Sequence, residues 1–327
     1  PETPSLHVMI VTRSKSELPA PSAEGSVVSI GVFDGVHKGH QQILADNVAR
    51  ARATGARPSV VTFSSHPKRL LLGRAPKTLT TLEHRLELFR RAGILHTLVL
   101  QFDEETRSTT AERFISEILL SGMDARSFVL GFDSKFGLEQ RGTPALLREL
   151  GHEVQVSEKV VVSGRAVSST AIREAVELGD LKSAEAMLGR RVSAFGEVVK
   201  GRGLGRELGF PTANLNLHHE LSPPTGVYAC LVRKIDTNAP HAPKEVYQAV
   251  TNIGFRPTVE ETRPERPQVE ALLLDFAGDL YGEYLELEFV ARLRGEERFE
   301  DLEALSSQIA RDVEEARGIL TGIQLTN

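Results

Sequence analysis

Short apolar runs alternate with helical patterns over the first half of the chain, from residue 26 to about residue 162. The runs are rich in β-branched residues, and the segments between them repeat apolar positions every three or four residues. Strands separated by helices favour a parallel sheet with helices on both faces, whose ligands bind at the carboxyl ends of the strands. The predicted strands are 27–33, 59–64, 97–102, 127–132 and 153–162, and the predicted helices are 40–55, 80–93, 110–122 and 143–151.

The pattern changes after a helical stretch at 169–191. Closely spaced strand-like runs bounded by Gly, Pro and Asn favour a small antiparallel barrel or sandwich. We place the domain boundary near Leu188, which gives domains at 1–187 and 188–327. The predicted strands of the second domain are 192–201, 212–217, 226–235, 245–254, 269–276 and 284–293.

The chain ends in a predicted helix with a single apolar stripe. We expect this stripe to pack against the barrel, because one apolar face on an otherwise polar helix is typical of a docked surface helix. The stripe consists of Leu302, Leu305, Ile309, Val313, Ala316 and Leu320.

Composition excludes several classes of protein. A net charge of -5 gives no reason to expect nucleic-acid binding, so any anion site must be built locally. The single cysteine, Cys230, excludes disulfides within the chain and argues against a cysteine-based zinc site. No apolar run approaches the roughly 18 residues of a membrane span, and the apolar stretch near the N-terminus is too short for a signal peptide. We therefore expect a cytoplasmic protein with no membrane partner.

The segment "GVFDGVHKGHQ" lies where the first predicted strand meets a helix, and it pairs His37 with His40. Histidines three residues apart share a helix face, so a metal pair and simple helix capping both stay open. A phosphate site explains more of the motif, because Gly31, Gly35 and Gly39 let a ligand approach the main chain near the positive end of a helix. Imidazole N–H groups could then donate to phosphate oxygens.

A second anion motif is "SSTAIREA", at 168–175. Ser169 and Thr170 are good N-cap residues, which is the simpler interpretation. However, Arg173 stands where a capping box would have Glu or Gln, and a cation in the first helical turn opposes the helix dipole. A bound phosphate would satisfy the hydroxyls, the free N–H groups and the guanidinium together.

Together with "TFSSHP" and "GFDSKFG", these two motifs resemble the adenylyltransferase module of bacterial bifunctional riboflavin kinase/FAD synthetases, a member of the HxGH nucleotidyltransferase superfamily. The resemblance implies a Rossmann-like nucleotidyltransferase domain. It also implies that Asp133 contacts the flavin, while Ser65 replaces the usual proline of the family and Ser134 a usual aromatic residue. The residues implied to bind or stabilise the ATP phosphates are Gly31, Phe33, His37, Gly39, His40, Ser169, Thr170 and Arg173.

In the second domain, "KGRGLGRELGFPTANL" opens with a basic glycine-rich loop that lacks the spacing of a Walker A motif. Backbone N–H groups of such loops can bind phosphates, although a mobile hairpin tip stays an alternative. Thr212 and Asn214 are two apart, so on a strand both side chains project from one face and offer oxygen ligands to a Mg²⁺–phosphate complex. Glu270 lies in an apolar strand, either facing solvent on a sheet edge or acting as a partly desolvated general base.

This half of the chain resembles the flavokinase barrel, through "GRGLGRELGFPTANL", "GVYA", "TNIGFRPT" and "VEALLLDF". The resemblance implies that Thr212 and Asn214 hold Mg²⁺–ATP and that Glu270 is the catalytic base. The family often has His two residues after that Glu, where this chain has Leu272. The loop residues implied to contact the ATP phosphates are Gly201, Gly203 and Arg206, with Asn214 beside them.

The two resemblances together predict a bifunctional enzyme that converts riboflavin to FMN and FMN to FAD. Its co-substrate would be ATP and its cofactor Mg²⁺, and its partners would be riboflavin, FMN and ATP. A homo-oligomer stays compatible with the sequence. Two alternatives are an adenylyltransferase for another phosphate ester and a flavin-binding regulatory protein without catalysis. The first would not explain the barrel, and the second would not need a general base.

Overall fold

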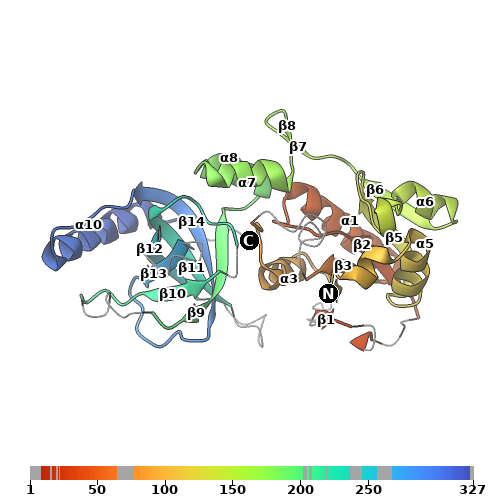
Figure 1. Ribbon diagram of the computed structural model, residues 1–327, viewed down its shortest axis with the longest axis horizontal. Helices are drawn as coiled ribbons and strands as arrows, with labels where there is room; N and C mark the ends of the chain where they lie inside the picture. The colour runs from red at the N-terminus through yellow and green to blue at the C-terminus, as the bar shows by residue number, and fades with distance from the viewer. Residues whose placement is uncertain are drawn as a thin grey trace. The chain divides into compact units, whose positions relative to one another are not determined.

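The computed structural model describes residues 9–14, 17–19, 21, 23–64, 77–201, 205, 208–217, 220–235, 245–255 and 267–324. The chain forms two compact units, Pro1–Ser169 and Thr170–Asn327 (Figure 1). The helical stretch after Ser169 is therefore grouped with the C-terminal unit, and a functional boundary near Leu188 stays a prediction. No helix in the described part of the chain is long and apolar enough to cross a membrane.

The N-terminal unit is built on a six-stranded sheet in the order β1-β4-β3-β2-β5-β6, in which every neighbouring pair is parallel. Its strands are β1 (Ile10–Thr12), β2 (Ser26–Ile30), β3 (Arg57–Phe63), β4 (His96–Leu100), β5 (Ala125–Gly131) and β6 (Glu153–Ser157). Its helices are α1 (Lys38–Thr54), α3 (Leu82–Arg91), α4 (Glu104–Ser108), α5 (Ala111–Arg113), the π-helix η2 (Phe114–Leu120), the 3₁₀ helix η3 (Leu138–Gln140) and α6 (Pro144–Glu149). A small hairpin, β7 (Val161–Val162) and β8 (Arg165–Ala166), follows the sheet.

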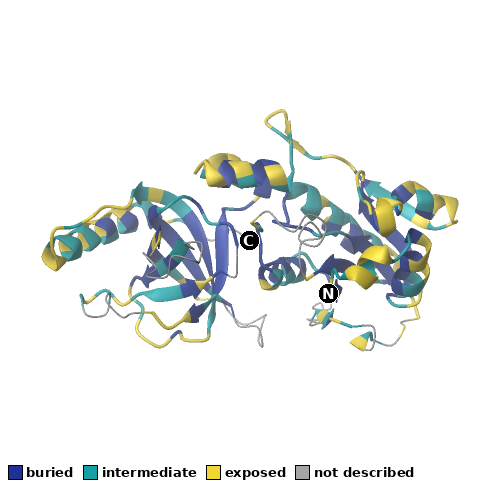
Figure 2. Cartoon of the chain, viewed as in Figure 1, coloured by how far each residue is buried: buried dark blue, intermediate teal, exposed yellow. Residues whose placement is uncertain are grey.

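Helices cover both faces of this sheet, as the sequence pattern predicts. Alternate residues of a strand point to opposite faces. Val28 of β2 and Phe128 of β5 belong to a core cluster with η2 and α6. Their neighbours Val27 and Val129 pack with Ala51 of α1 instead. The near-continuous burial of β2 and β3 follows from this sandwiching, because a strand that is covered on both faces is buried at nearly every position (Figure 2).

The C-terminal unit is a closed antiparallel barrel in the strand order β10-β13-β12-β11-β14-β9. The antiparallel prediction is confirmed, and closure decides between the barrel and the sandwich. The strands are β9 (Ser193–Val199), β10 (Ala213–Asn216), β11 (Gly226–Ile235), β12 (Val246–Phe255), β13 (Pro267–Leu273) and β14 (Tyr284–Arg294). The helices are α7 (Ser169–Glu177), α8 (Leu181–Leu188) and α10 (Leu302–Leu320).

The terminal helix α10 uses only part of its predicted stripe for packing on the barrel. Ala316 and Leu320 are fully buried against β11. By contrast, Leu302 is 56% exposed, so the prediction was wrong for the first stripe position. Leu305 and Ile309 line a cavity described below. The C-terminal part of the stripe therefore packs on the barrel, whereas its middle part forms a wall of the cavity.

Protonation of a buried histidine should couple the stability of the N-terminal unit to pH. His96 at the start of β4 is 1% exposed, and its Nε2 lies 3.1 Å from the Thr12 hydroxyl of β1. Burial, assisted by Arg57, lowers the pKa of His96 to about 4. Between pH 6.5 and 4, His96 is protonated in the unfolded chain but stays neutral in the folded one. The free energy of unfolding therefore falls as the pH is lowered through this range.

We expect His96→Gln to remove this part of the pH dependence. The difference in unfolding free energy between wild type and variant should change by about 2 kcal/mol between pH 7 and pH 5. The chain has no tryptophan, so urea unfolding is followed by circular dichroism. A pH slope that is the same in both proteins would contradict the assignment.

Candidate active sites

The first candidate site lies where the strand order of the parallel sheet reverses. β2 has β3 on one side and β5 on the other, so the connections leaving β2 and β5 diverge at their carboxyl ends (Figure 1). Ligands of open α/β sheets bind at such switch points. The motif "GVFDGVHKGH" follows β2, and "GFDSKFG" begins at the last residue of β5. The fold therefore brings two of the predicted motifs to one edge of the sheet.

The turn after β2 has an unusual backbone. Phe33, Gly35 and Val36 have φ angles of +53°, +81° and +38°. Positive φ is uncommon for any residue with a side chain and rarer for a β-branched one such as Val36. The Val36 N–H closes the turn on the Phe33 carbonyl at 3.0 Å. Strained residues of this kind persist only where surrounding contacts hold them, and they cluster at functional sites.

Asp34 supplies the contacts that hold the turn. Its Oδ1 accepts hydrogen bonds from the backbone N–H groups of Leu79 (2.9 Å) and Thr80 (3.1 Å). The Thr80 hydroxyl in turn accepts from the Gly35 N–H at 2.9 Å. Asp34 is 4% exposed. Because a buried carboxylate that loses its donors is costly, these bonds fix the turn to the segment that precedes α3.

The two histidines lie at the start of α1. His37 is its N-cap, and the His37 Nδ1 accepts from the His40 N–H at 3.4 Å. The two rings stack with centroids 3.6 Å apart, and His40 also meets the edge of Phe33 at 5.1 Å. Burial, His37 and Arg85 together lower the pKa of His40 well below its usual value. His40 is therefore neutral at pH 7, so it can act on an anion as an N–H donor but not as a cation.

The other predicted residues of this motif are two glycines, which leave room for neighbouring rings, and Phe33, whose side chain is buried. A Cβ atom on Gly39 would lie 3.3 Å from the His37 ring, and one on Gly31 would lie 3.1 Å from the Phe33 ring. The Phe33 side chain is 2% exposed and packs edge-on against Phe89. The Phe33 ring is thus a core residue, which leaves only its main chain for contact with a ligand.

The fold joins the two anion motifs through Ser169. The Ser169 hydroxyl donates to the Asp34 carbonyl at 2.9 Å, although 135 positions separate the two residues. Helix α7 begins at Ser169, and this hydroxyl bonds to the histidine turn, a long-range role that the capping interpretation did not include. Thr170, which is exposed, and Arg173 follow in the same helix, and their part in an anion site stays a prediction.

Asp133 lies in the connection after β5, and it is exposed. The Ser134 N–H donates to the Gly131 carbonyl at 3.1 Å, so the segment turns sharply as it leaves the strand. Phe132 is 55% exposed, and the Lys159 ammonium lies 5.9 Å from the centre of its ring. An aromatic ring is thus present two residues before position 134, where the family usually has an aromatic residue and this chain has Ser134. Ser65 lies outside the described residues.

The second candidate site is a cavity of about 370 Å³ in the barrel unit. Its walls combine apolar side chains with polar and charged ones, and Thr212, Asn252 and Glu270 are among the polar residues. A cavity of this size in which polar groups converge between apolar walls is typical of a small-molecule site. A second cavity of about 300 Å³, lined by Phe276 and Tyr281, also has Thr212 in its wall. Thr212 therefore borders both spaces.

Strand register aligns the polar residues of this site. Glu270 on β13 is paired with Asn214 on β10 and with Asn252 on β12. Directly paired residues share a face, so the two amides flank the carboxylate. β13 has neighbours on both sides within the closed barrel, which excludes the edge-strand interpretation of Glu270. Leu272, two residues further along β13, also lines the cavity.

The glycine-rich loop approaches these residues where it is described. A Cβ atom on Gly201 would overlap the side-chain amide of Asn214. A Cβ atom on Gly205 would overlap the Phe210 carbonyl and lie 3.2 Å from the Thr212 hydroxyl. Glycine at both positions therefore lets the main chain approach the two predicted Mg²⁺–ATP residues. Gly203 and Arg206 lie outside the described residues.

Comparison with known proteins identifies the family. A FAD synthetase family model matches residues 20–171, and a riboflavin kinase model matches residues 188–320. The bifunctional riboflavin kinase/FMN adenylyltransferases of Escherichia coli K12, Pseudomonas fluorescens and Bacillus subtilis are 36%, 38% and 35% identical to the chain. The alignments cover 90%, 91% and 89% of this chain and 92%, 94% and 91% of those proteins. The chain belongs to the bifunctional riboflavin kinase/FMN adenylyltransferase family.

A solved structure agrees with the two-unit architecture of this family member. A crystal structure from Streptococcus pneumoniae, described as a "Macrolide-efflux Protein", superposes with a TM-score of 0.77 at 30% sequence identity. The match covers 95% of this chain and 99% of that one. That description belongs to the other protein, whereas the shared fold extends over nearly the whole length of both chains.

Three residues in or beside the candidate sites of this riboflavin kinase/FMN adenylyltransferase were not singled out from the sequence. Asp34 lies within the histidine motif, and its position between an apolar run and Gly35 was a usable signal of a structured turn. Asn252 became visible only through the register of β12 with β13. Arg85 occupies the buried face of α3, where a charged residue in an otherwise amphipathic helix is easily taken for a surface residue.

Gly35 should tolerate alanine poorly, for two separate reasons. Its φ of +81° disfavours any Cβ atom, and that atom would lie 2.8 Å from the Leu79 side chain. Gly151 is a matched control, because its φ is +84° and nothing lies within 4 Å of its Cβ position. We expect Gly151→Ala to cost about 1 kcal/mol, and Gly35→Ala to cost roughly 2–3 kcal/mol by urea unfolding, since backbone strain and overpacking add. Equal costs would show that the Leu79 contact does not constrain the turn.

Proposed function

We propose that the chain is a bifunctional enzyme of flavin cofactor synthesis. The barrel unit transfers the γ-phosphate of ATP to riboflavin, which gives FMN and ADP. The N-terminal α/β unit transfers AMP from ATP to FMN, which gives FAD and pyrophosphate. The observation that supports this most directly is the order of the two family matches, FAD synthetase before riboflavin kinase, over one continuous chain.

In the kinase step, Glu270 would accept the proton of the ribityl 5′-hydroxyl as that oxygen attacks the γ-phosphorus of ATP. The proposal is supported by the position of Glu270 in the wall of a cavity of about 370 Å³, which is large enough for a flavin ring and partly lined by apolar side chains. Asn214 and Asn252 flank the carboxylate in the strand register. A positioned carboxylate base and neutralised phosphate oxygens are the usual sources of acceleration in phosphoryl transfer.

Mg²⁺ fits the oxygen ligands that the barrel offers. No cluster of three or more His, Cys, Asp or Glu side chains suited to a metal occurs among the described residues. Mg²⁺ commonly needs few protein ligands, because it keeps water and binds the phosphates of its substrate. The Thr212 hydroxyl and the Asn214 amide oxygen would hold it beside the glycine-rich loop. When bound, the ion would neutralise charge on the ATP phosphates.

In the adenylyl-transfer step, a phosphate oxygen of FMN would attack the α-phosphorus of ATP, and pyrophosphate would leave. His37 and His40 would donate hydrogen bonds to phosphate oxygens at the N-terminus of α1, where the helix dipole also favours an anion. The hydrogen bond that the His37 Nδ1 accepts leaves its Nε2 to carry the proton. Ser169, Thr170 and Arg173 would complete this site, with Asp133 near the flavin.

The chemistry of the two units favours neither alternative function. An adenylyltransferase for another ester would not need the barrel with its carboxylate, and a regulatory protein would need no base. A cytoplasmic location, the oligomeric state and the lack of a nucleic-acid partner stay predictions.

Glu270→Gln should strongly slow FMN formation without affecting FAD formation from supplied FMN. Loss of a general base is expected to lower the kcat of the kinase step by roughly 100-fold to 10,000-fold. FMN and FAD are separated by chromatography after incubation with riboflavin, ATP and Mg²⁺. Glu197→Gln is the matched control, because Glu197 lies on barrel strand β9 and is not among the residues that line either barrel cavity.

His37→Ala and His40→Ala should give the opposite result. Each variant removes an N–H donor from the phosphate site, so we expect FAD formation to fall by roughly 100-fold or more, as for loss of one preorganised donor. FMN formation in the same protein is the control for folding and ATP quality. A single substitution that abolishes both steps in a folded protein would refute the two-site assignment.

A further inference from the structure

Arg85, near the start of α3, is a buried arginine that contacts the end of β3 and the segment that follows β2. It is 4% exposed. Its Nη1 donates to the Val32 carbonyl at 2.5 Å, and its Nη2 donates to the Phe63 carbonyl at 3.1 Å. The Thr62 hydroxyl donates to the same Val32 carbonyl at 3.3 Å. The guanidinium therefore ties the end of β3 to the residue that immediately precedes the strained turn.

Burial of the charged Arg85 side chain at this position costs free energy of folding. Its hydrogen-bond acceptors given above are neutral carbonyls, and a third, weaker bond goes to the Thr81 carbonyl at 3.4 Å. Burial lowers the pKa of Arg85, whereas Asp34 and Glu83 oppose the shift. Arginine nevertheless stays protonated in proteins. Burying a charge costs several kcal/mol, and an apolar residue of similar size usually gives equal or greater stability. Packing alone therefore does not explain an arginine here.

The segment Leu79–Arg85 holds the histidine turn from both of its ends. The Leu79 and Thr80 N–H groups bind the Asp34 carboxylate inside the turn. One helical turn later, Arg85 binds the Val32 carbonyl just before it. Phe33 and Val36, the two residues with side chains at positive φ, lie between or directly beside these anchors. The energy stored in this backbone must be offset by surrounding contacts, and these are the contacts that do so.

We propose that Arg85 is a positioning residue of the adenylyl-transfer site, holding the turn 33–36 so that His37 and His40 reach the phosphates of ATP. The proposal rests on the function proposed above for the N-terminal unit. Arg85 acts through Val32 and the turn and not by contact with substrate. Misplacement of a catalytic group by about 1 Å can cost roughly 100-fold in rate, so loss of this anchor should affect catalysis strongly.

Arg85 also influences the protonation of His40. His37, stacked on its ring, and Arg85, on α3, both add to burial in lowering the pKa of His40, whose third neighbour is the uncharged Phe33. Removing the Arg85 charge should therefore raise the pKa of His40. The neutral His40 ring is the form present at pH 7, so protonation of His40 should reduce the rate of adenylyl transfer. If the pKa of His40 is raised, this loss of rate should begin at a higher pH. A side chain that only fills space would not produce this change.

The test compares Arg85→Met and Arg85→Lys in the full-length enzyme. We expect Arg85→Met to lower kcat/KM for FAD formation from FMN by roughly 100-fold, mainly through kcat, and to move the acid limb of its pH profile upward. Arg85→Lys keeps the charge but cannot bind the Val32 and Phe63 carbonyls with two separate nitrogens. The acid limb of its pH profile should therefore stay near that of the wild type. Its rate of FAD formation should fall less than that of Arg85→Met. FMN formation should stay within about twofold in both variants.

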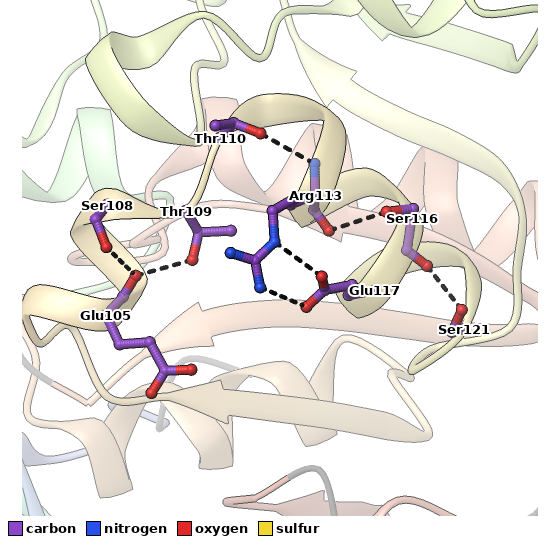
Figure 3. Close-up of polar contacts among 8 residues, drawn as sticks. All are labelled: Glu105, Ser108, Thr109, Thr110, Arg113, Ser116, Glu117 and Ser121. Carbon is purple, nitrogen blue, oxygen red and sulfur yellow. Dashed lines mark hydrogen bonds and ion pairs between the residues drawn. The ribbon is translucent and has the colours of Figure 1, made fainter.

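Arg113→Met provides a matched control from the same unit. Arg113 pairs with Glu117 on the outer surface of the η2 segment, with Nε to Oε1 at 2.9 Å (Figure 3). Its side chain is 64% exposed, so loss of this ion pair costs little. We expect wild-type rates of both reactions in this variant.

Three results would overturn the proposal. FAD formation by Arg85→Met could match that of Arg113→Met. It could fall only in proportion to the unfolded fraction measured by circular dichroism, which would show a structural role alone. The acid limb could also shift equally in the Lys and Met variants. A wild-type enzyme that makes no FAD from FMN would instead refute the proposed function, so the two failures are distinguishable.

Discussion

The hydrogen bonds of the buried Asp34 carboxylate are the interaction on which the proposed adenylyl-transfer site depends. The carboxylate binds the backbone N–H groups of Leu79 and Thr80, and so fixes a turn that contains two side-chain-bearing residues at positive φ. The same residue accepts the Ser169 hydroxyl through its main-chain carbonyl. One residue thus connects the histidine motif, the start of α3 and the serine motif, which lie far apart in the sequence.

The two sites use electrostatics differently. In the N-terminal unit, the groups proposed to bind phosphate are imidazole N–H donors and the N-terminus of α1, and burial, His37 and Arg85 lower the pKa of His40. In the barrel, a carboxylate lies between two amides on adjacent strands. This difference matches the proposed chemistry, since adenylyl transfer needs donors to phosphate oxygens whereas phosphorylation of a hydroxyl also needs a base.

Helix α10 contributes both to the packing of the barrel and to the wall of the candidate kinase cavity. Its C-terminal half packs Ala316 and Leu320 on the barrel, while Leu305 and Ile309 line the cavity that contains Glu270. Between them, the buried Asp312 binds Arg294 of β14 through Nε and Nη2 at 3.0 and 2.8 Å. Because this ion pair joins the helix to the barrel at the cavity wall, the shape of the cavity depends on how the terminal helix docks.

Local patterns in the sequence determined much of this protein. Apolar periodicity predicted most strands and helices of both units, although it missed β1 and α4 and joined β6 and β7 into one strand. The motifs around His37, Ser169, Thr212 and Glu270 marked residues that the fold places in or beside the two candidate sites. Periodicity reports which face of an element is buried, and this depends on neighbours a few residues away. It reports nothing about strand order or register. The bond from Ser169 to Asp34, the position of Glu270 on an interior strand between two asparagines, and the anchoring of Val32 by Arg85 were therefore decided by tertiary structure alone, because each depends on strands and helices that are distant in the chain and meet only when the sheet and the barrel have formed.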